Sequence, residues 1–225
     1  MRHDYMTIGE AGKKFVEKML DFLFPKPPET QAIEQMSPEK FLLRAPPAEF
    51  FEEEVTALFE YRNSLVRSAV WEIKYWKNES IARMIAKIIH DHLLEEISLA
   101  RIFKNFEQPL LVPIPASKRR LRERGYNQCE FLVKQIADID GGKNFEVADI
   151  LRKTRETSPQ TEIKQKNKRR ENVKGCFTLT QKARVNGRNI IIIDDVITTG
   201  STIQEARRAL REAGARKIIA FAIAH

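Results

Sequence analysis

The order of hydrophobic and polar positions along the chain predicts short buried strands that alternate with amphipathic helices. Residues 190–193 are four consecutive isoleucines, and a β-branched run that is apolar on both faces is typical of a central parallel strand covered by helices on both sides. Alternation of such strands with helices predicts an α/β fold with a mostly parallel sheet flanked by helices. The predicted strands cover residues 55–61, 110–112, 190–193 and 217–223, and the predicted helices cover 64–77, 79–97, 127–137 and 201–213.

Prolines separate the amino-terminal part of the chain from the rest. Apolar residues recur at helical spacing over 9–24, and a second, short helix is predicted around 38–43. The prolines within 25–28 end the first helix, and Pro46-Pro47 marks a second break, because proline lacks the backbone donor that a helix needs. The expected domains are a small helical appendage and linker over residues 1–48 and an α/β domain over residues 49–225.

A hairpin with a long insertion is predicted between the helix at 127–137 and the isoleucine run. Residues 149–153 and 175–180 have the pattern of its two arms, and the segment 156–170 between them is polar and basic. A loop of this length inside a compact domain is usually either functional or disordered. We therefore treat this insertion as a candidate functional loop.

Paired carboxylates follow the isoleucine run, and a turn of small and hydroxyl-bearing residues follows them. The carboxyl end of a strand is where open α/β sheets bind their ligands. Backbone N–H groups at the start of the next helix, together with its partial positive charge, bind a phosphate dianion. Carboxylates would repel phosphate, but they suit sugar hydroxyls or a magnesium ion held through water. The stretch predicts a ribose-phosphate site made by Asp194, Asp195, Thr198, Thr199, Gly200, Ser201 and Thr202.

Two other interpretations of this stretch exist. A hydrophobic strand that ends in aspartates could be the Walker B strand of a nucleotide hydrolase, or simply a strand followed by a helix cap. A Walker B strand requires a glycine-rich loop that ends in Lys-Ser or Lys-Thr. The nearest candidate, Gly141-Gly142-Lys143-Asn144, lacks the first glycine spacing and the hydroxyl, so the ribose-phosphate interpretation is favoured.

A short loop dense in cations is predicted after the strand at 110–112, so it also lies at a strand's carboxyl end. The chain carries a formal net charge of +8, and residues 113–175 hold sixteen Lys and Arg against nine Asp and Glu. An excess of positive charge beside a phosphate site suits a pyrophosphate, or equally a nucleic-acid backbone. The alternative is a solvated basic turn that touches no ligand. The residues expected to bind pyrophosphate are Ala116, Ser117, Lys118, Arg119, Arg122 and Arg124.

Composition limits the class of protein. Of the 225 residues, 42% are hydrophobic and 31% charged, and no apolar run approaches the ~20 residues that a membrane span requires. We expect no membrane insertion and, since no secretory signal is evident, a cytoplasmic location. The two cysteines, Cys129 and Cys176, are far apart and are expected to be reduced structural thiols.

The segment 190–202 resembles the signature of type I phosphoribosyltransferases, which bind phosphoribosyl pyrophosphate in this loop. The resemblance implies a type I phosphoribosyltransferase fold, with a hood that covers the acceptor and comes here from about 55–97. It also implies that Asp194 and Asp195 contact the ribose 2′ and 3′ hydroxyls and act in any catalysis, while 198–202 hold the 5′-phosphate. In such enzymes a mobile hairpin closes over the site. Its matching residues here are Arg155, Gln160, Arg169 and Asn172.

Further motifs narrow the resemblance. They are Val112-Pro113-Ile114-Pro115, Arg124-Gly125-Tyr126-Asn127-Gln128, Leu151-Arg152, Asn172-Val173-Lys174-Gly175, Ile73-Lys74-Tyr75 and Leu23-Phe24-Pro25. In combination they resemble the ComF family of phosphoribosyltransferase-like proteins, which is associated with natural competence and DNA uptake. Many of its members carry zinc-binding cysteine pairs after the Phe-Pro landmark. This chain has no cysteine before Cys129, so it is similar to a variant without that module and no zinc is expected.

The residues and the resemblance together lead to three functional hypotheses. The first is a magnesium-dependent enzyme that binds phosphoribosyl pyrophosphate and transfers the phosphoribosyl group to an unidentified acceptor, releasing pyrophosphate. The second is a non-catalytic adaptor in DNA uptake whose partner is a DNA-translocating helicase. The third is direct binding of single-stranded DNA by a basic run that lacks interleaved aromatic residues. That run contains Lys164, Lys166, Lys168, Arg169 and Arg170.

Overall fold

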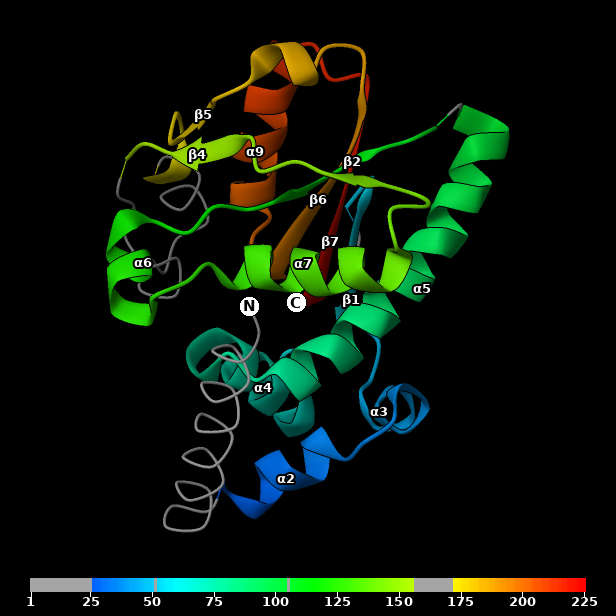
Figure 1. Cartoon of the computed structure of the whole chain (residues 1–225), viewed down its shortest axis with the longest axis vertical. Coiled ribbons are helices and arrows are strands. Elements are labelled where there is room, and N and C mark those ends of the chain that lie inside the picture. The colour runs from blue at the N-terminus through cyan, green and yellow to red at the C-terminus, as the bar shows by residue number, and fades with distance from the viewer. Residues whose placement is uncertain (1–25, 51, 105, 156–171) are drawn as a thin grey trace, which may run out of the picture. The chain divides into compact units, whose positions relative to one another are not determined.

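The computed structural model describes residues 26–50, 52–104, 106–155 and 172–225 (Figure 1). The chain divides into two compact units, Met1–Met36 and Ser37–His225, each of which is described by itself. The helix predicted over 9–24 lies outside the described residues.

The described part of the first unit contains one short helix, α2 (Pro28–Glu34). Pro28 occupies the first helical position, where the missing N–H has no partner to lose and the fixed φ angle suits the helix. Lys26 forms an ion pair with Glu34 at 2.7 Å. The proline cluster therefore begins a helix here, whereas the sequence interpretation used it only as a break.

The second unit is built on a five-stranded sheet with the order β1-β7-β6-β2-β3, in which every neighbouring pair is parallel. The register places Ile191 of the central strand β6 opposite Leu111 of β2 and Ile219 of β7. The predicted mostly parallel sheet is thus confirmed, and the isoleucine run lies at its centre. The strands are β1 (Val55–Phe59), β2 (Leu110–Pro113), β3 (Glu146–Val147), β6 (Asn189–Val196) and β7 (Lys217–Ala224).

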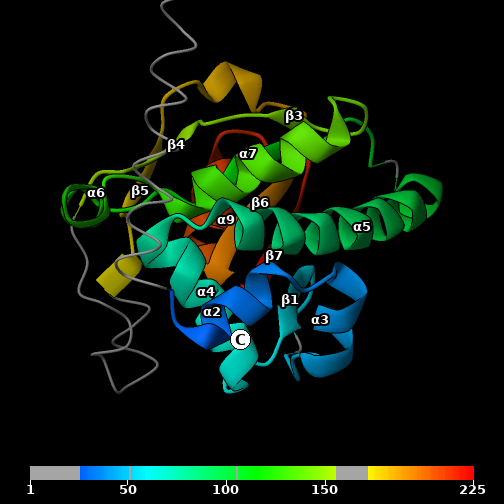
Figure 2. The same ribbon diagram turned by 60° about the horizontal axis from the view of Figure 1, so that its bottom comes forward.

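Helices cover both faces of this sheet (Figures 1 and 2). α5 (Glu79–Lys104) and α7 (Gln128–Asp140) lie side by side on one face, and α9 (Ser201–Glu212) packs on the other. Successive side chains of β6 alternate between the two faces, so both sides of the isoleucine run are buried. Among the helices that the structure describes, none is both long and apolar enough to cross a membrane.

Two helical segments flank the first strand of the sheet. α3 (Pro38–Arg44) is capped by Ser37, and its Phe41 packs edge-on against Phe59 of β1 with 5.3 Å between ring centroids. This contact joins α3 to the second unit, although the sequence interpretation assigned residues up to 48 to the appendage. After β1, α4 (Ser64–Trp71) continues into a π-helical turn, η1 (Glu72–Trp76).

The predicted hairpin is present as β4 (Leu151–Lys153) and β5 (Phe177–Leu179), which pair antiparallel beside the main sheet, and a short 3₁₀ turn, η2 (Lys182–Arg184), follows it. The cationic segment differs from expectation. It forms a short helix, α6 (Lys118–Arg124), instead of a loop, because Ser117 caps its start and Gly125 ends it at a φ of 79°.

Candidate functional site

A cavity of about 280 Å³ lies at the carboxyl ends of β2 and β6, where the predicted site residues follow their strands. Its walls come from the segment after β1, from η1, α7 and the hairpin, and from the residues that follow β2 and β6. The lining residues are Tyr61, Lys74, Ile114, Pro115, Ala116, Arg120, Gln128, Cys129, Lys153, Val173, Asp194, Asp195, Val196, Thr198 and Thr202.

The acidic pair lies at the carboxyl end of β6, where the sequence places it, and forms one wall of this cavity. Asp194 and Asp195 are 7% and 8% exposed. The Lys74 ammonium lies 3.1 Å from Asp195 Oδ2, and Gln128 Nε2 donates to the same oxygen at 3.1 Å. The backbone N–H of Val196 donates to Asp195 Oδ1 at 2.8 Å. Both oxygens of Asp195 are therefore held, one of them by a cation.

The second carboxylate has a different environment. Asp194 Oδ1 accepts a hydrogen bond from the backbone N–H of Asp195 at 2.9 Å, and the Cys129 thiol lies 3.6 Å from it. Burial and the neighbouring Asp195 charge raise the pKa of Asp194 to about 7. Burial would also raise the pKa of Asp195, but the charge and hydrogen bond of Lys74 outweigh it and lower that pKa. Asp195 is thus the firmly ionised member of the pair.

The predicted phosphate turn sits beside the acidic pair. Gly200 adopts a φ of 71° and directly precedes Ser201, the first residue of α9. The Thr199 and Ser201 hydroxyls lie 2.8 Å apart, while Thr198 and Thr202 line the cavity. This φ lies in the left-handed region, which residues with a Cβ atom rarely adopt, so glycine is favoured at position 200. The geometry places backbone N–H groups of a helix start next to two carboxylates, as a ribose 5-phosphate requires.

The residues expected to bind pyrophosphate are only partly gathered at the cavity. Ala116 lines it, and so does Arg120, which the sequence interpretation missed. The Ser117 hydroxyl accepts a hydrogen bond from the Arg120 N–H at 3.3 Å as the cap of α6. Lys118, Arg119 and Arg122 are exposed on α6.

Arg124 was also expected to bind pyrophosphate, and the structure shows which protein groups it contacts. Its guanidinium donates to Gln128 Oε1 at 3.1 Å and to the Tyr75 hydroxyl at 3.4 Å, and it stacks 4.7 Å from the centre of the Tyr75 ring. Arg124 therefore orients Gln128, which in turn holds Asp195. A role in binding pyrophosphate stays a prediction.

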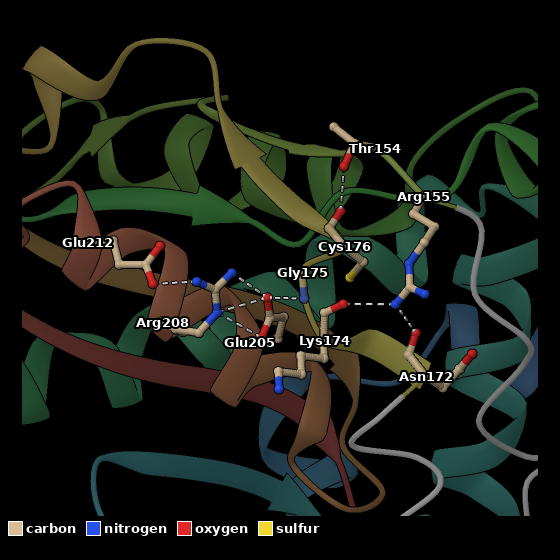
Figure 3. Close-up of polar contacts among 9 residues, drawn as sticks. All are labelled: Thr154, Arg155, Asn172, Lys174, Gly175, Cys176, Glu205, Arg208 and Glu212. Carbon is tan, nitrogen blue, oxygen red and sulfur yellow. Dashed lines mark hydrogen bonds and ion pairs between the residues drawn. The ribbon is translucent and has the colours of Figure 1, made fainter.

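The base of the predicted mobile hairpin is anchored to α9 (Figure 3). Arg155 donates to the carbonyls of Asn172 and Lys174 at 3.0 and 2.8 Å, which ties the two arms together. Gly175 donates its N–H to the buried Glu205 carboxylate at 2.7 Å, and Glu205 is also held by Arg208. Since α9 begins at the phosphate turn, the hairpin base and that turn share one helix. The predicted loop residues Gln160 and Arg169 lie outside the described residues.

Several cavity residues were not assigned to the site from sequence. Lys74 and Gln128 occur in motifs that carried the family resemblance, but their position beside Asp195 depends on packing between distant elements. Cys129 was expected to be structural, and its buried thiol contacts Asp194. The two family motifs were the available signal, because neither residue stands in a spacing that indicates a ligand.

The acidic pair also decides which metal the site suits. The ligand atoms of Cys129, Asp194 and Asp195 lie within 4.8 Å of one another. Burial and the adjacent carboxylates raise the pKa of the Cys129 thiol well above its ordinary value, so it stays protonated and is a poor metal ligand. Carboxylate oxygens suit magnesium, which keeps several of its waters. The residues therefore fit a magnesium ion held through water beside a bound sugar.

The chain has an open α/β fold with a parallel sheet, and its cavity lies at the carboxyl ends of the strands, where such folds bind their ligands. The family described as phosphoribosyl transferase domain matches residues 80–225, which is more than half of the chain. The chain belongs to the phosphoribosyltransferase family, and the type I fold predicted from sequence is confirmed.

Similar proteins of known name show which branch of this family the chain resembles. Competence protein F of Haemophilus influenzae is 28% identical over 165 residues, which cover 71% of this chain and 66% of that protein. DNA utilization protein YhgH of Salmonella typhimurium is 31% identical over 150 residues, which cover 66% of this chain and 62% of that protein. These matches confirm the resemblance to the ComF family. They span slightly less than two thirds of each relative's length.

Among solved structures, the chain is similar to glutamine phosphoribosylpyrophosphate amidotransferase from B. subtilis complexed with ADP and GMP. The identity is 16%, the match covers 68% of this chain and 30% of that chain, and the TM-score is 0.42. At that TM-score the likeness carries no functional conclusion.

Proposed function

We propose that the cavity binds phosphoribosyl pyrophosphate with magnesium and that the protein transfers the phosphoribosyl group to an acceptor. One observation carries the proposal: two buried carboxylates and the turn at the start of α9 line the same cavity in a member of the phosphoribosyltransferase family. In this proposal the ribose hydroxyls donate to Asp194 and Asp195, and the 5′-phosphate accepts from the backbone N–H groups of 198–202.

The proposed reaction is a substitution at C1 of the ribose. The acceptor's lone pair forms a bond to C1 while the C1–O bond breaks and its electron pair leaves with pyrophosphate. Positive charge develops on the sugar in the transition state, as in glycoside chemistry. The ionised Asp195 stabilises this charge, and Arg120 with the positive face of α6 attracts the departing anion. Bound magnesium would supply further charge neutralisation at the pyrophosphate.

Calorimetry with phosphoribosyl pyrophosphate and magnesium tests the proposal. Wild-type protein is expected to bind, and the double variant Asp194→Ala, Asp195→Ala to lose binding because both acceptors for the ribose hydroxyls are gone. Glu212→Ala, an exposed carboxylate on α9, is the matched control and should bind as wild type does. Wild-type protein that fails to bind at millimolar ligand would contradict the proposal. Pyrophosphate release in the presence of candidate amines and bases then identifies the acceptor.

A second candidate function, binding of single-stranded DNA, is supported by an exposed aromatic surface. Trp71, Tyr75 and Trp76, here called the aromatic surface, are 52%, 43% and 71% exposed. The ring centroids of Trp71 and Tyr75 lie 4.2 Å apart with the ring planes tilted by 42°, and the Arg124 guanidinium at the end of the cationic α6 covers Tyr75. Exposed rings beside cations form the usual platform on which unpaired bases stack.

Fluorescence anisotropy with a labelled oligothymidine tests this second function. Binding should weaken as salt increases, with a logarithmic slope of about −0.7 per phosphate neutralised. Trp76→Ala should lower the affinity by about 1–3 kcal/mol, the usual value of one stacked base. Leu43→Ala removes a side chain that is 87% exposed on α3 and serves as the control. A flat salt response, or equal affinity of Trp76→Ala and wild type, would contradict DNA binding by this surface.

A further inference from the structure

Lys74 reaches the ligand site from the region before residue 80, outside the segment that the phosphoribosyltransferase family matches. It lies on the π-helical turn η1, and its side chain is 20% exposed. Single π-helical turns occur frequently at functional sites. Among the described residues, Lys74 is the cation that forms an ion pair with a member of the acidic pair.

A cation is needed at this position because the two carboxylates are adjacent and buried. Like charges this close disfavour double ionisation, and burial disfavours each charge further. The Lys74 ammonium contacts Asp195 Oδ2 at 3.1 Å, and its own pKa is raised by the Asp195 charge. Without that ammonium the pair would hold its proton up to a higher pH. A protonated carboxyl is a poorer acceptor for the sugar hydroxyls.

Tyr126 holds the turn that carries Lys74. Its hydroxyl donates to the carbonyl of Ile73 and accepts from the backbone N–H of Lys77 at 3.0 Å. These two groups lie on either side of Lys74 along the turn, and Lys77 ends the turn at a left-handed φ of 51°. Tyr126 belongs to the same short segment as Arg124 and Gln128, so one stretch of chain fixes both donors of Asp195 Oδ2.

We propose that Lys74 is a positioning residue for the ribose site, whose ion pair holds the Asp195 carboxylate in place in the cavity wall, and that Tyr126 fixes the turn that carries Lys74. The inference rests on the proposed binding of phosphoribosyl pyrophosphate and assigns the hood a role in building the ribose site as well as in covering it. It also explains the role of two family motifs, Ile73-Lys74-Tyr75 and Arg124–Gln128. Each motif contributes one donor, Lys74 or Gln128, to the same Asp195 oxygen.

Other charged and titratable groups face the pair and must be considered in any pH measurement. Cys129 of α7 contacts Asp194 and stays protonated. Arg120 of α6 and Lys153 of β4 line the same cavity. Lys74 is the group whose charge lowers the pKa of Asp195 most, so replacing Lys74 is expected to change the titration of the pair most.

The test measures binding of magnesium and phosphoribosyl pyrophosphate by calorimetry between pH 5 and 9. Lys74→Met should weaken binding about tenfold at neutral pH and move the acidic limb of the profile upward by about one pH unit or more, because removing an opposite charge raises a carboxyl pKa by about that much. Lys74→Arg keeps a cation and should restore affinity to within about threefold of wild type. Tyr126→Phe should show a smaller effect of the same sign, and its effect should not add to that of Lys74→Met.

Lys87→Met on α5, which removes a lysine paired with Asp91 away from the cavity, is the matched control and should leave the profile unchanged. If Lys74→Met does not fold, the profile of Tyr126→Phe decides the question. An unshifted profile in the folded variants, or equal loss in Lys74→Met and Lys74→Arg, would overturn the inference alone. Wild-type protein that does not bind would overturn the proposed function and this inference together.

Discussion

Replacing Asp194 by asparagine should stabilise the ligand-free protein at alkaline pH while it removes ligand binding. Asp194 is 7% exposed, and its pKa is raised from 3.8 to about 7. The folded state therefore binds this proton more tightly than the unfolded chain does, so the free energy of unfolding falls as the pH rises from about 4 through 7. The folded and unfolded pKa values differ by about three, and a difference of one corresponds to about 1.4 kcal/mol. The free energy of unfolding is therefore lower by ~4 kcal/mol at pH 8.5 than at acidic pH.

The asparagine side chain recovers about half of this energy. Its carbonyl can still accept from the Asp195 N–H and the Cys129 thiol, and it carries no charge. The new amide N–H groups need partners in a buried position, which costs about 1–2 kcal/mol. The net expectation is a gain of about 2 kcal/mol at pH 8.5, or about 4–8 °C in melting temperature for a chain of this size, and no gain at pH 5.5.

Thermal unfolding of wild-type and Asp194→Asn protein at pH 5.5 and 8.5 measures this directly. Asp195→Asn is the informative contrast, because it leaves the Lys74 ammonium without its partner. It should destabilise the protein by at least about 2 kcal/mol at neutral pH, somewhat below the cost of breaking a fully buried pair since Lys74 is one-fifth exposed. Wild-type stability that does not fall between pH 5.5 and 8.5, or an Asp194→Asn variant less stable than wild type at pH 8.5, would refute the reasoning.

Three further predictions concern the hairpin base, the phosphate turn and the core. Glu205→Gln should accelerate amide exchange at Gly175 and lower stability by about 1–2 kcal/mol, since a charged acceptor is lost; unchanged exchange would contradict the anchoring role. Gly200→Ala should cost about 1 kcal/mol or more and weaken binding of phosphoribosyl pyrophosphate, because φ is 71°; calorimetry showing wild-type affinity would contradict it. Phe41→Ala should lower stability by about 3–5 kcal/mol in denaturant unfolding, and a cost below 1 kcal/mol would show that α3 is not packed on β1.

The sheet could be predicted from sequence because its central strands are apolar on both faces. The isoleucine run has no polar face that could contact solvent, so it fits a central strand of a parallel sheet and not an edge strand. β3 escaped prediction, since Glu146 and Val147 are both exposed and pair with β2 only through the backbone. α6 carried its own signals, Ser117 and Gly125, but the density of cations between them favoured a loop. The length of α5 beyond residue 97 was also missed.

Only the part of the ligand site that is contiguous in the chain could be predicted from the sequence. The acidic pair and the phosphate turn are contiguous in the chain, so one local pattern indicates both. Lys74 and Gln128 meet Asp195 from elements far away in sequence, and the π-helical turn that aims Lys74 depends on a contact with Tyr126. No local periodicity encodes such a contact. The family motifs contain both residues but do not show what either residue does.

A crystal structure of the protein with phosphoribosyl pyrophosphate and magnesium tests the central claim most directly. The account predicts the ribose hydroxyls on Asp194 and Asp195, the 5′-phosphate on the backbone N–H groups of 198–202, and Lys74 still paired with Asp195. Ligand bound elsewhere, or a 5′-phosphate that does not contact the turn before α9, would contradict it.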